Sequence, residues 1–270
     1  MPEGDGPLAV LFDMGGTIED VVVDGESIAR GAAMLAGRLE REGITKHISA
    51  PEDLVRQIEN GLRLYKIDTK RGREYLECSP REIWAQWLLG SILSSPGKLT
   101  DDLAEELSFT WETVFQKRRL RPEAKSVLEE LARRGYPMGI ISNSISRTQV
   151  GFTLRKYGLT PYFATVQVSA VVGRRKPDPL IFGRAASALG LLPERCMYVG
   201  DTVTQDVLGA RAGCYGYVLL MRSPLGLTAD AMDGGHTAGL ARLRHGTWGG
   251  RIAALPDILS VLEEKPWRSL

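Results

Sequence analysis

Short apolar runs alternate along this chain with stretches whose apolar positions recur every three or four residues. This alternation predicts strands separated by helices, the pattern of βαβ units and a parallel sheet. The apolar runs contain few polar interruptions, as expected of strands that helices cover on both faces. Strands are expected at Leu8–Phe12, Pro137–Ile141, Ala164–Val168, Cys196–Val199 and Tyr217–Leu220. Helices are expected at Glu123–Arg134, Ser146–Tyr157, Pro179–Leu189, Thr204–Ala212 and Pro256–Glu264.

The region from about Asp24 to Arg119 breaks this rhythm, because it has helical periodicity and no strong strand-like run. Helices are expected there at Ser27–Glu42, Glu52–Tyr65, Pro80–Leu93 and Asp101–Gln116. We therefore expect two domains, an α/β core formed by residues 1–22 and 120–270 and a helical cap formed by residues 23–119. The cap tryptophans stand at helical spacings and are expected to pack in its interior. They are Trp84, Trp87 and Trp111.

The composition narrows the kinds of partner. The chain has 270 residues with 34 Lys and Arg against 33 Asp and Glu, and no long run of like charge. This balance argues against a nucleic-acid or membrane partner and favours a small-molecule substrate. No stretch approaches the roughly 20 apolar residues that span a bilayer, so a cytoplasmic location is expected. Cys78, Cys196 and Cys214 lack metal-ligand spacing and are expected to be idle thiols. The pattern does not predict an oligomeric state.

Polar residues stand where the first two core strands end, and open parallel sheets bind ligands beyond the carboxyl ends of their strands. Asp13 follows the first strand in the segment LAVLFDMGGTIED, and Ser142 and Asn143 follow the second strand in IISNS. Each feature alone is equally typical of a turn or a helix N-cap.

Two further segments add a cation and a pair of carboxylates. Lys176 lies in GRRKPDP, before a proline and a helix start, and Asp201 and Asp206 lie in YVGDTVTQD after the fourth strand. A lone loop lysine is usually a solvated charge, and Asp201 is also a suitable N-cap. Two carboxylates beside a glycine turn, however, form a hard-oxygen site that suits Mg²⁺.

Together and in this order, the four segments resemble the motifs of the haloacid dehalogenase superfamily. The resemblance covers residues 7–22 and 120–220 and implies a Rossmann-like parallel sheet core with an inserted helical cap. It also implies a Mg²⁺-dependent hydrolase, phosphatase-like, that acts on a small phosphorylated metabolite through an aspartyl phosphate.

The resemblance implies a role for each matching residue. Asp13 would be the nucleophile, Ser142 a hydrogen-bond donor to the transferring group, and Lys176 its electrostatic clamp. The expected metal ligands are Asp13, the Gly15 main-chain carbonyl, Asp201 and Asp206. The residues expected to position phosphoryl oxygens are Gly16, Thr17 and Asn143. This assignment is physically coherent, because Mg²⁺ and an ammonium group offset the repulsion between a carboxylate and a phosphoryl dianion.

The first motif departs from the family pattern. Most phosphatases of the family read Asp-x-Asp, with the second aspartate as acid and base, whereas this chain reads Asp13-Met14-Gly15. A positioned proton donor is typically worth ~10²- to 10⁴-fold in rate. The cap could supply another acid, for which Glu74, Glu77 and Glu82 are the candidates. Alternatively, the leaving group needs no proton, as in an acyl phosphate.

Two further alternatives are that the chain catalyses a different reaction or that it catalyses no reaction. The superfamily includes dehalogenases, which act without Mg²⁺, and phosphonate hydrolases, which need a cap lysine such as Lys66 or Lys70. The intact GDTVTQD segment favours phosphorus chemistry over C–halogen or C–P cleavage. A chain that only binds a phosphorylated ligand is the remaining alternative.

Substrate contacts are expected in the cap, where Arg71, Arg73 and Tyr75 suit an anionic substrate. The glycine-rich segment Ser223–Gly250, which contains His236 and His245, is expected to be a surface loop.

Overall fold

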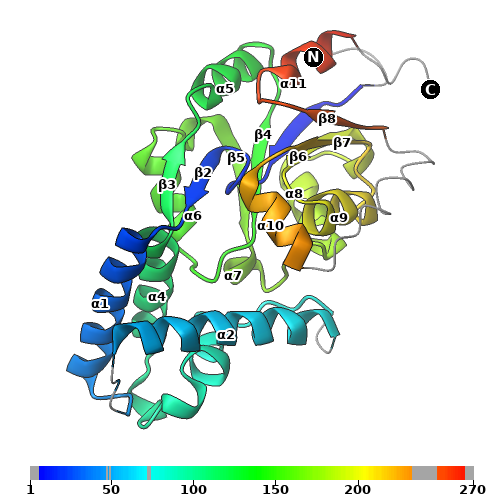
Figure 1. The fold of residues 1–270 in the computed structure, drawn as a ribbon. Helices are drawn as coiled ribbons and strands as arrows, with labels where there is room; N and C mark the ends of the chain where they lie inside the picture. Colours follow the sequence, from blue (N-terminus) through cyan, green and yellow to red (C-terminus); the bar gives the residue numbers. More distant parts are fainter. Residues whose placement is uncertain (1–5, 47, 49, 72–73, 233–247, 265–270) are drawn as a thin grey trace.

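A six-stranded parallel sheet lies at the centre of the computed structural model, which describes residues 6–46, 48, 50–71, 74–232 and 248–264 (Figure 1). The strand order is β5-β4-β1-β6-β7-β8. Its strands are β1 Ala9–Phe12, β4 Met138–Ser142, β5 Phe163–Val168, β6 Cys196–Gly200, β7 Tyr217–Met221 and β8 Trp248–Ile252. The five strands expected from the sequence are confirmed, and β8 is an addition at one edge.

Strand β1 shows why the apolar runs lack alternation. All four of its side chains are fully buried, because consecutive residues face opposite layers of helices. Val10 and Phe12 join the apolar cluster that contains residues of α5 Ala124–Arg133, α6 Gln149–Lys156 and α11 Asp257–Glu264. Ala9 and Leu11 join the cluster of α8 Pro179–Ala188 and α9 Leu208–Ala212. The expected α/β fold class is therefore confirmed.

A helical insertion, running from α1 to η4, lies beside the carboxyl ends of the central strands (Figure 1). Its α-helices are α1 Gly25–Glu42, α2 Pro51–Arg71, α3 Pro80–Ile83 and α4 Asp101–Thr110. Its shorter turns are the π-helical η1 Trp84–Leu88 and η4 Trp111–Phe115 and the 3₁₀ turns η2 Gly90–Ile92 and η3 Pro96–Lys98.

The helical insertion has an apolar core of its own. Trp84 is fully buried and donates its indole N–H to the Ser108 hydroxyl at 2.8 Å. Trp111 stacks near Phe115, with ring centroids 4.3 Å apart, and Trp87 packs against this cluster. The expectation that the three tryptophans are packing residues is confirmed.

A two-stranded antiparallel ribbon joins the insertion to the core. Strand β2 Glu19–Val22 leads into α1, and β3 Lys117–Leu120 returns from η4. Neither strand was expected, because both are short and polar. Arg118 of β3 bonds the carboxylates of Glu19 and Glu112, so a buried ion cluster fixes this connection.

The expectation of a surface loop over residues 223–250 is wrong wherever the structure describes that segment. Residues Pro224–Met232 form helix α10, and β8 begins at Trp248. Ser223, which precedes α10, is buried because the segment packs against the motif that contains Asp201. His236 and His245 lie outside the described residues.

Short elements complete the core: η5 Thr160–Tyr162, α7 Ser169–Val172, η6 Pro193–Arg195 and the π-helical η7 Val203–Val207. Cys78 and Cys196 are buried, Cys214 is exposed, and all three are free thiols. Among the described helices, none combines the length and apolarity that a bilayer crossing requires.

Candidate active site

The strand order places three of the expected residues side by side. Strands β4, β1 and β6 are neighbours, so their carboxyl ends meet at one edge of the sheet. Asp13 directly follows β1, Ser142 ends β4, and Asp201 directly follows β6. Asp206 comes from η7, so two successive elements supply the late pair of carboxylates.

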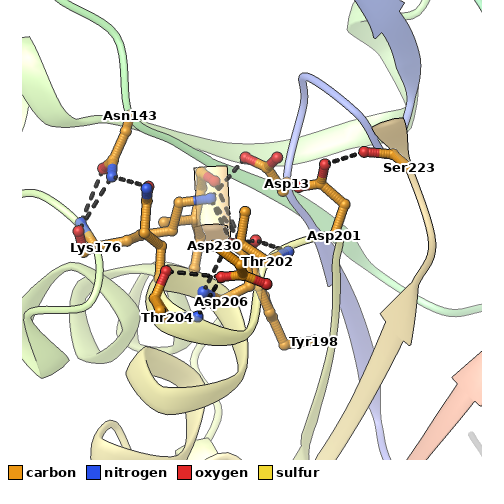
Figure 2. A network of polar contacts seen from close by, with 12 residues as sticks. Asp13, Asn143, Lys176, Tyr198, Asp201, Thr202, Thr204, Asp206, Ser223 and Asp230 are labelled. Carbon is orange, nitrogen blue, oxygen red and sulfur yellow. Dashed lines mark hydrogen bonds and ion pairs between the residues drawn. The ribbon is translucent and has the colours of Figure 1, made fainter. Parts of the chain in front are cut away.

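The Lys176 side chain links these elements (Figure 2). It is only 3% exposed, and its Nζ donates to Asp13 Oδ1 at 2.6 Å and to Asp206 Oδ1 at 2.6 Å. The Tyr198 hydroxyl lies 3.1 Å from the same nitrogen and donates to Asp206 Oδ1 at 3.0 Å. A lysine that looked like a solvated loop charge is therefore a buried counter-ion.

Burial and neighbouring charges shift the pKa values of the three carboxyl groups, upward for Asp13 and Asp201 and downward for Asp206. Burial raises the pKa of Asp13 to about 6 although the Lys176 charge opposes it, and burial together with the charges of Asp13 and Asp206 raises the pKa of Asp201 to about 8. Burial also disfavours the ionised Asp206 carboxylate, but the charge and hydrogen bonds of Lys176 outweigh it and lower the pKa of Asp206.

The site is therefore short of positive charge. Asp13, Asp201 and Asp206 are all buried, and each offers an oxygen within 4.8 Å of the others. Lys176 supplies one positive charge for three carboxylates, which leaves an excess of two negative charges when all are ionised. A hard divalent cation with carboxylate ligands fits this excess and this donor set.

The three carboxylates are not equivalent as possible ligands. Both oxygens of Asp206 already accept hydrogen bonds, from Lys176 and Tyr198 on one side and from Thr202 on the other. Asp201 accepts from the Ser223 hydroxyl through Oδ2. Asp206 is therefore better placed to bind a cation through water, while Asp13 and Asp201 suit direct ligation.

Asn143 holds the loop that carries Lys176. Its side-chain carbonyl accepts from the Lys176 backbone N–H at 2.8 Å, and its amide donates to the Lys176 backbone carbonyl at 3.1 Å. The same amide donates to Gln205 Oε1 at 2.9 Å. Asn143 therefore positions the loop that carries Lys176 beside the site, and its part in positioning phosphoryl oxygens stays a prediction.

Gly16 permits a close approach between two motifs. Its φ is +88°, and an added Cβ would lie 2.0 Å from Asp201 Oδ2, so no other residue fits. Its N–H donates to the Glu19 carbonyl at 2.7 Å and so stabilises the turn after β1. Thr17 is fully buried, and its hydroxyl has no hydrogen-bond partner among the residues that the structure describes.

Gly15 leaves room beside the site. A Cβ added there would be in ordinary contact, 3.5 Å from Val21, 3.7 Å from Arg118 Nη1 and 3.7 Å from Leu225. The position where the family usually carries its acid therefore faces a guanidinium group here, and this group does not donate a proton at neutral pH.

Four supporting residues were not expected from the sequence: Tyr198, Thr202, Ser223 and Asp230. Tyr198 lies inside a buried strand, where its hydroxyl was hidden in an apolar run. Asp230 of α10 accepts from the backbone N–H groups of Val203 and Thr204 at 2.8 and 2.9 Å. Ser223 follows β7, so the rule that polar residues at strand ends form sites could have found it.

Two of the three acids expected as replacements in the cap have structural partners. Glu77 is buried against Arg175 and accepts from the Tyr65 hydroxyl, while Glu82 caps α3 through Ser79. Glu74 is exposed and has φ +48°. The structure therefore brings none of the three to Asp13 by a described contact.

Of the expected cap cations, Lys66 and Lys70 line a cavity together with Tyr75. Arg73 and the Arg71 side chain lie outside the described residues.

Comparisons with known proteins agree with this geometry. The family model for a haloacid dehalogenase-like hydrolase matches residues 7–213. The chain is 40% identical over 103 residues to the phosphoserine phosphatase of Thermus thermophilus, a match that covers 37% of this chain and 41% of that protein. It is 29% identical over 206 residues to the glyceraldehyde 3-phosphate phosphatase of Methanopyrus kandleri, covering 76% of this chain and 80% of that one.

Solved structures add a likeness of fold. The 2-haloacid dehalogenase of Pseudomonas syringae pv. Tomato aligns over 96% of this chain and 99% of its own, with a TM-score of 0.62 and 20% identity. At this identity the match concerns the fold alone.

Proposed function

The chain belongs to the haloacid dehalogenase-like hydrolase family, and we propose that it hydrolyses a small phosphorylated metabolite, with Asp13 as nucleophile and Mg²⁺ as cofactor. The observation that carries this proposal is the buried Lys176 ammonium, which bonds both Asp13 and Asp206 at 2.6 Å beside a third carboxylate. The two relatives that are phosphatases by name support phosphoryl chemistry.

We further propose that residues 1–22 and 120–270 act as the catalytic core and residues 23–119 as a cap. Two observations support this division. The helical insertion packs around its own apolar cluster, and a two-stranded ribbon carries the chain into it and back. A cap over the strand ends can exclude water from the reacting groups.

In the first step, an Asp13 carboxylate oxygen attacks phosphorus and the bond to the leaving-group oxygen breaks. The product is an aspartyl phosphate and a leaving group that carries the released electron pair. Lys176 lies against the attacked side chain, so its charge offsets the repulsion between carboxylate and phosphoryl dianion. Ser142, at the tip of β4, is the proposed donor to a phosphoryl oxygen.

In the second step, water attacks the phosphorus of the aspartyl phosphate, which restores the Asp13 carboxylate and releases phosphate. Asp13, Asp201, Asp206 and the Gly15 carbonyl would hold Mg²⁺, which supplies charge neutralisation at the transferring phosphoryl group. Asn143 and Tyr198 keep the Lys176 ammonium in position throughout, because they bond its backbone and its Nζ.

The test is release of inorganic phosphate from acetyl phosphate and p-nitrophenyl phosphate, with Mg²⁺ and with EDTA. Asp13→Asn should lower the rate by at least roughly 10³-fold because it removes the nucleophile. Asp20→Asn is the matched control: Asp20 lies in the same segment, but its side chain is 47% exposed and pairs with Arg121. Its rate should stay within about 2-fold of wild type, because Asp20 is half exposed and has no described contact with Asp13, Lys176 or Asp201.

An Asp13→Asn rate equal to wild type would overturn the nucleophile assignment. Release that persists in EDTA would overturn the metal assignment. If no phosphoryl compound is cleaved, halide release from 2-haloacids and phosphate release from phosphonates separate the two carbon-centred alternatives. A phosphorylated ligand that is bound and never cleaved would leave the binding-only alternative.

A further inference from the structure

A cavity lies where the carboxyl-terminal part of α2 meets the core. Its volume is about 260 Å³. The insertion lines it with Lys66, Lys70 and Tyr75, and the core lines it with Arg175, Lys176 and Gln205 among others. Lys176 lines the cavity and also bonds Asp13, so this residue belongs to both the cavity lining and the catalytic group.

The lining is strongly cationic. Four of its ten residues are Lys or Arg, and none is acidic. Lys66 and Lys70 stand four residues apart on α2, so they project from the same face of that helix. Lys176 is occupied by the Asp13 and Asp206 carboxylates. Lys66, Lys70 and Arg175 add three cations to the lining, and Arg175 also lies against the Glu77 carboxylate.

Arg175 is held in place by the insertion. Its backbone N–H donates to the Tyr75 carbonyl at 3.0 Å, and its guanidinium lies 3.6 Å from Glu77 and 5.5 Å from the centre of the Tyr65 ring. The Glu77 carboxylate also accepts from the Tyr65 hydroxyl. These contacts join the α2 end of the insertion to the residue next to Lys176, so the cavity is a built feature between two elements.

We propose that this cavity binds a second anionic group of the substrate, a carboxylate or a second phosphate, and so selects phosphometabolites that carry a negatively charged group besides the phosphoryl group that is transferred. The inference rests on the proposed function and names the substrate class for that site. The volume suits only the end of a small metabolite, because pockets for drug-sized ligands occupy ~300–1,000 Å³. Lys66 and Lys70 act as specificity residues, and Asp13 and Lys176 carry out the chemistry.

The experiment measures inhibition of acetyl phosphate hydrolysis by matched pairs of compounds. One pair is 3-phosphoglycerate and glycerol 3-phosphate, which differ by a carboxylate in place of a hydroxymethyl group. The other pair is 1,3-propanediol bisphosphate and propyl phosphate, which tests a second phosphate. In at least one pair, the member with the additional anionic group should inhibit about 10-fold more strongly than its match, and the pair that shows this identifies the group.

The variant Lys66→Gln/Lys70→Gln should remove most of that difference. Both lysines are exposed, and two solvent-exposed charge contacts are together worth up to roughly 10-fold in affinity. Acetyl phosphate turnover should remain, since neither lysine is part of the catalytic group. Lys46→Gln/Lys98→Gln is the matched control, because it removes two exposed charges from the same insertion outside the cavity lining. It should leave both inhibition constants within about 2-fold of wild type.

Equal inhibition by both members of each pair would overturn the inference, and so would an equal effect of the control variant. Failure of the proposed function has a different signature. If wild type cleaves no phosphoryl compound, calorimetric titration of wild type and of Lys66→Gln/Lys70→Gln with the same pairs still tests the cavity. Tighter binding of the member with the additional anionic group, lost in the double variant, would then support anion binding in the cavity even though the proposed reaction had failed.

Discussion

Gly15 is the residue at which the first motif departs from the family pattern, and its surroundings indicate what the difference does. The space beside it faces the Arg118 guanidinium, which is bonded to Glu19 and Glu112. Because two carboxylates already pair with this guanidinium, the Arg118 cluster supplies neither a proton nor a surplus positive charge to a leaving group. This arrangement is most useful for substrates whose leaving groups are already weak bases, such as acyl phosphates.

Gly15→Asp should increase the rate with a poor leaving group relative to a good one. The added side chain fits, because its Cβ would have contacts of 3.5 Å or longer and no positive φ is required. The gain should stay below the ~10²- to 10⁴-fold of a well-placed acid, because Arg118 would hold the new carboxylate ionised. The measurement is the ratio of kcat/KM for glycerol 3-phosphate to that for acetyl phosphate.

Gly15→Asn provides the control for that ratio, since it adds nearly the same volume without an ionisable group. If Asn and Asp change the ratio equally, proton donation is not the cause. If neither changes it, position 15 does not face the leaving group.

At the scale of elements, the buried strands were predictable and the connections were not. Strand β1 consists of AVLF, and all four side chains are buried, so its apolar run was sufficient to predict a buried strand. Strand β3 consists of KRRL, and it is a strand only because β2 pairs with it across the base of the insertion. Local sequence cannot signal a strand whose stability depends on a partner almost 100 residues away.

The candidate site shows the same division. Asp13, Ser142 and Asp201 were predictable because they stand at strand ends, where the order of the strands brings them together. Tyr198 and Asp230 were not, because they act only through contacts between segments: a hydroxyl facing Lys176 and a carboxylate of α10 facing η7. The sequence pattern showed neither which side chains α10 turns toward the site nor that α10 exists.

Helix α10 leads to a prediction at this scale. Asp230 accepts hydrogen bonds from Val203 N–H, Thr204 N–H and the Thr204 hydroxyl, so it holds the start of η7, which carries Asp206. Asp230→Ala should lower the free energy of unfolding by about 1–3 kcal/mol, as for a lost charged acceptor. The melting temperature should fall by roughly 2–10 °C, and the Mg²⁺ concentration for half-maximal activity should rise.

Thr228→Ala is the control on the same helix, because Thr228 is exposed and its hydroxyl bonds only the Pro224 carbonyl. It should change neither quantity appreciably. An Asp230→Ala variant that melts at the wild-type temperature and needs no additional Mg²⁺ would show that α10 does not support the site.

At the scale of the whole molecule, the acidic cluster links stability to both pH and metal. In the metal-free protein the pKa of Asp13 is about 6 and that of Asp201 about 8, both above the ordinary 3.8 of an aspartate. Between pH 4 and 8 the folded state therefore binds more protons than the unfolded state. The stability from these two groups is fully present at low pH and is lost as pH rises through 6 and 8.

Mg²⁺ should replace those protons, so its stabilising effect should increase with pH. In EDTA the melting temperature should fall between pH 6 and pH 8.5, and saturating Mg²⁺ should raise it more at pH 8.5 than at pH 6. A ligand at 100 times its Kd contributes about 2.7 kcal/mol, enough to shift the melting temperature by several degrees. The pKa of Asp206 is lowered and that of Lys176 is raised from ordinary values outside this range, so neither titrates between the two pH values.

Asp201→Asn separates this linkage from general effects of pH. The variant lacks the carboxylate with the higher of the two raised pKa values, so its melting temperature in EDTA should fall less between pH 6 and 8.5. It should also gain less from Mg²⁺, because one of the two carboxylates suited to direct ligation is gone. If the variant and wild type instead lose the same stability with rising pH and gain the same stability from Mg²⁺, the cation binds elsewhere and the excess negative charge at the strand ends has another counter-ion.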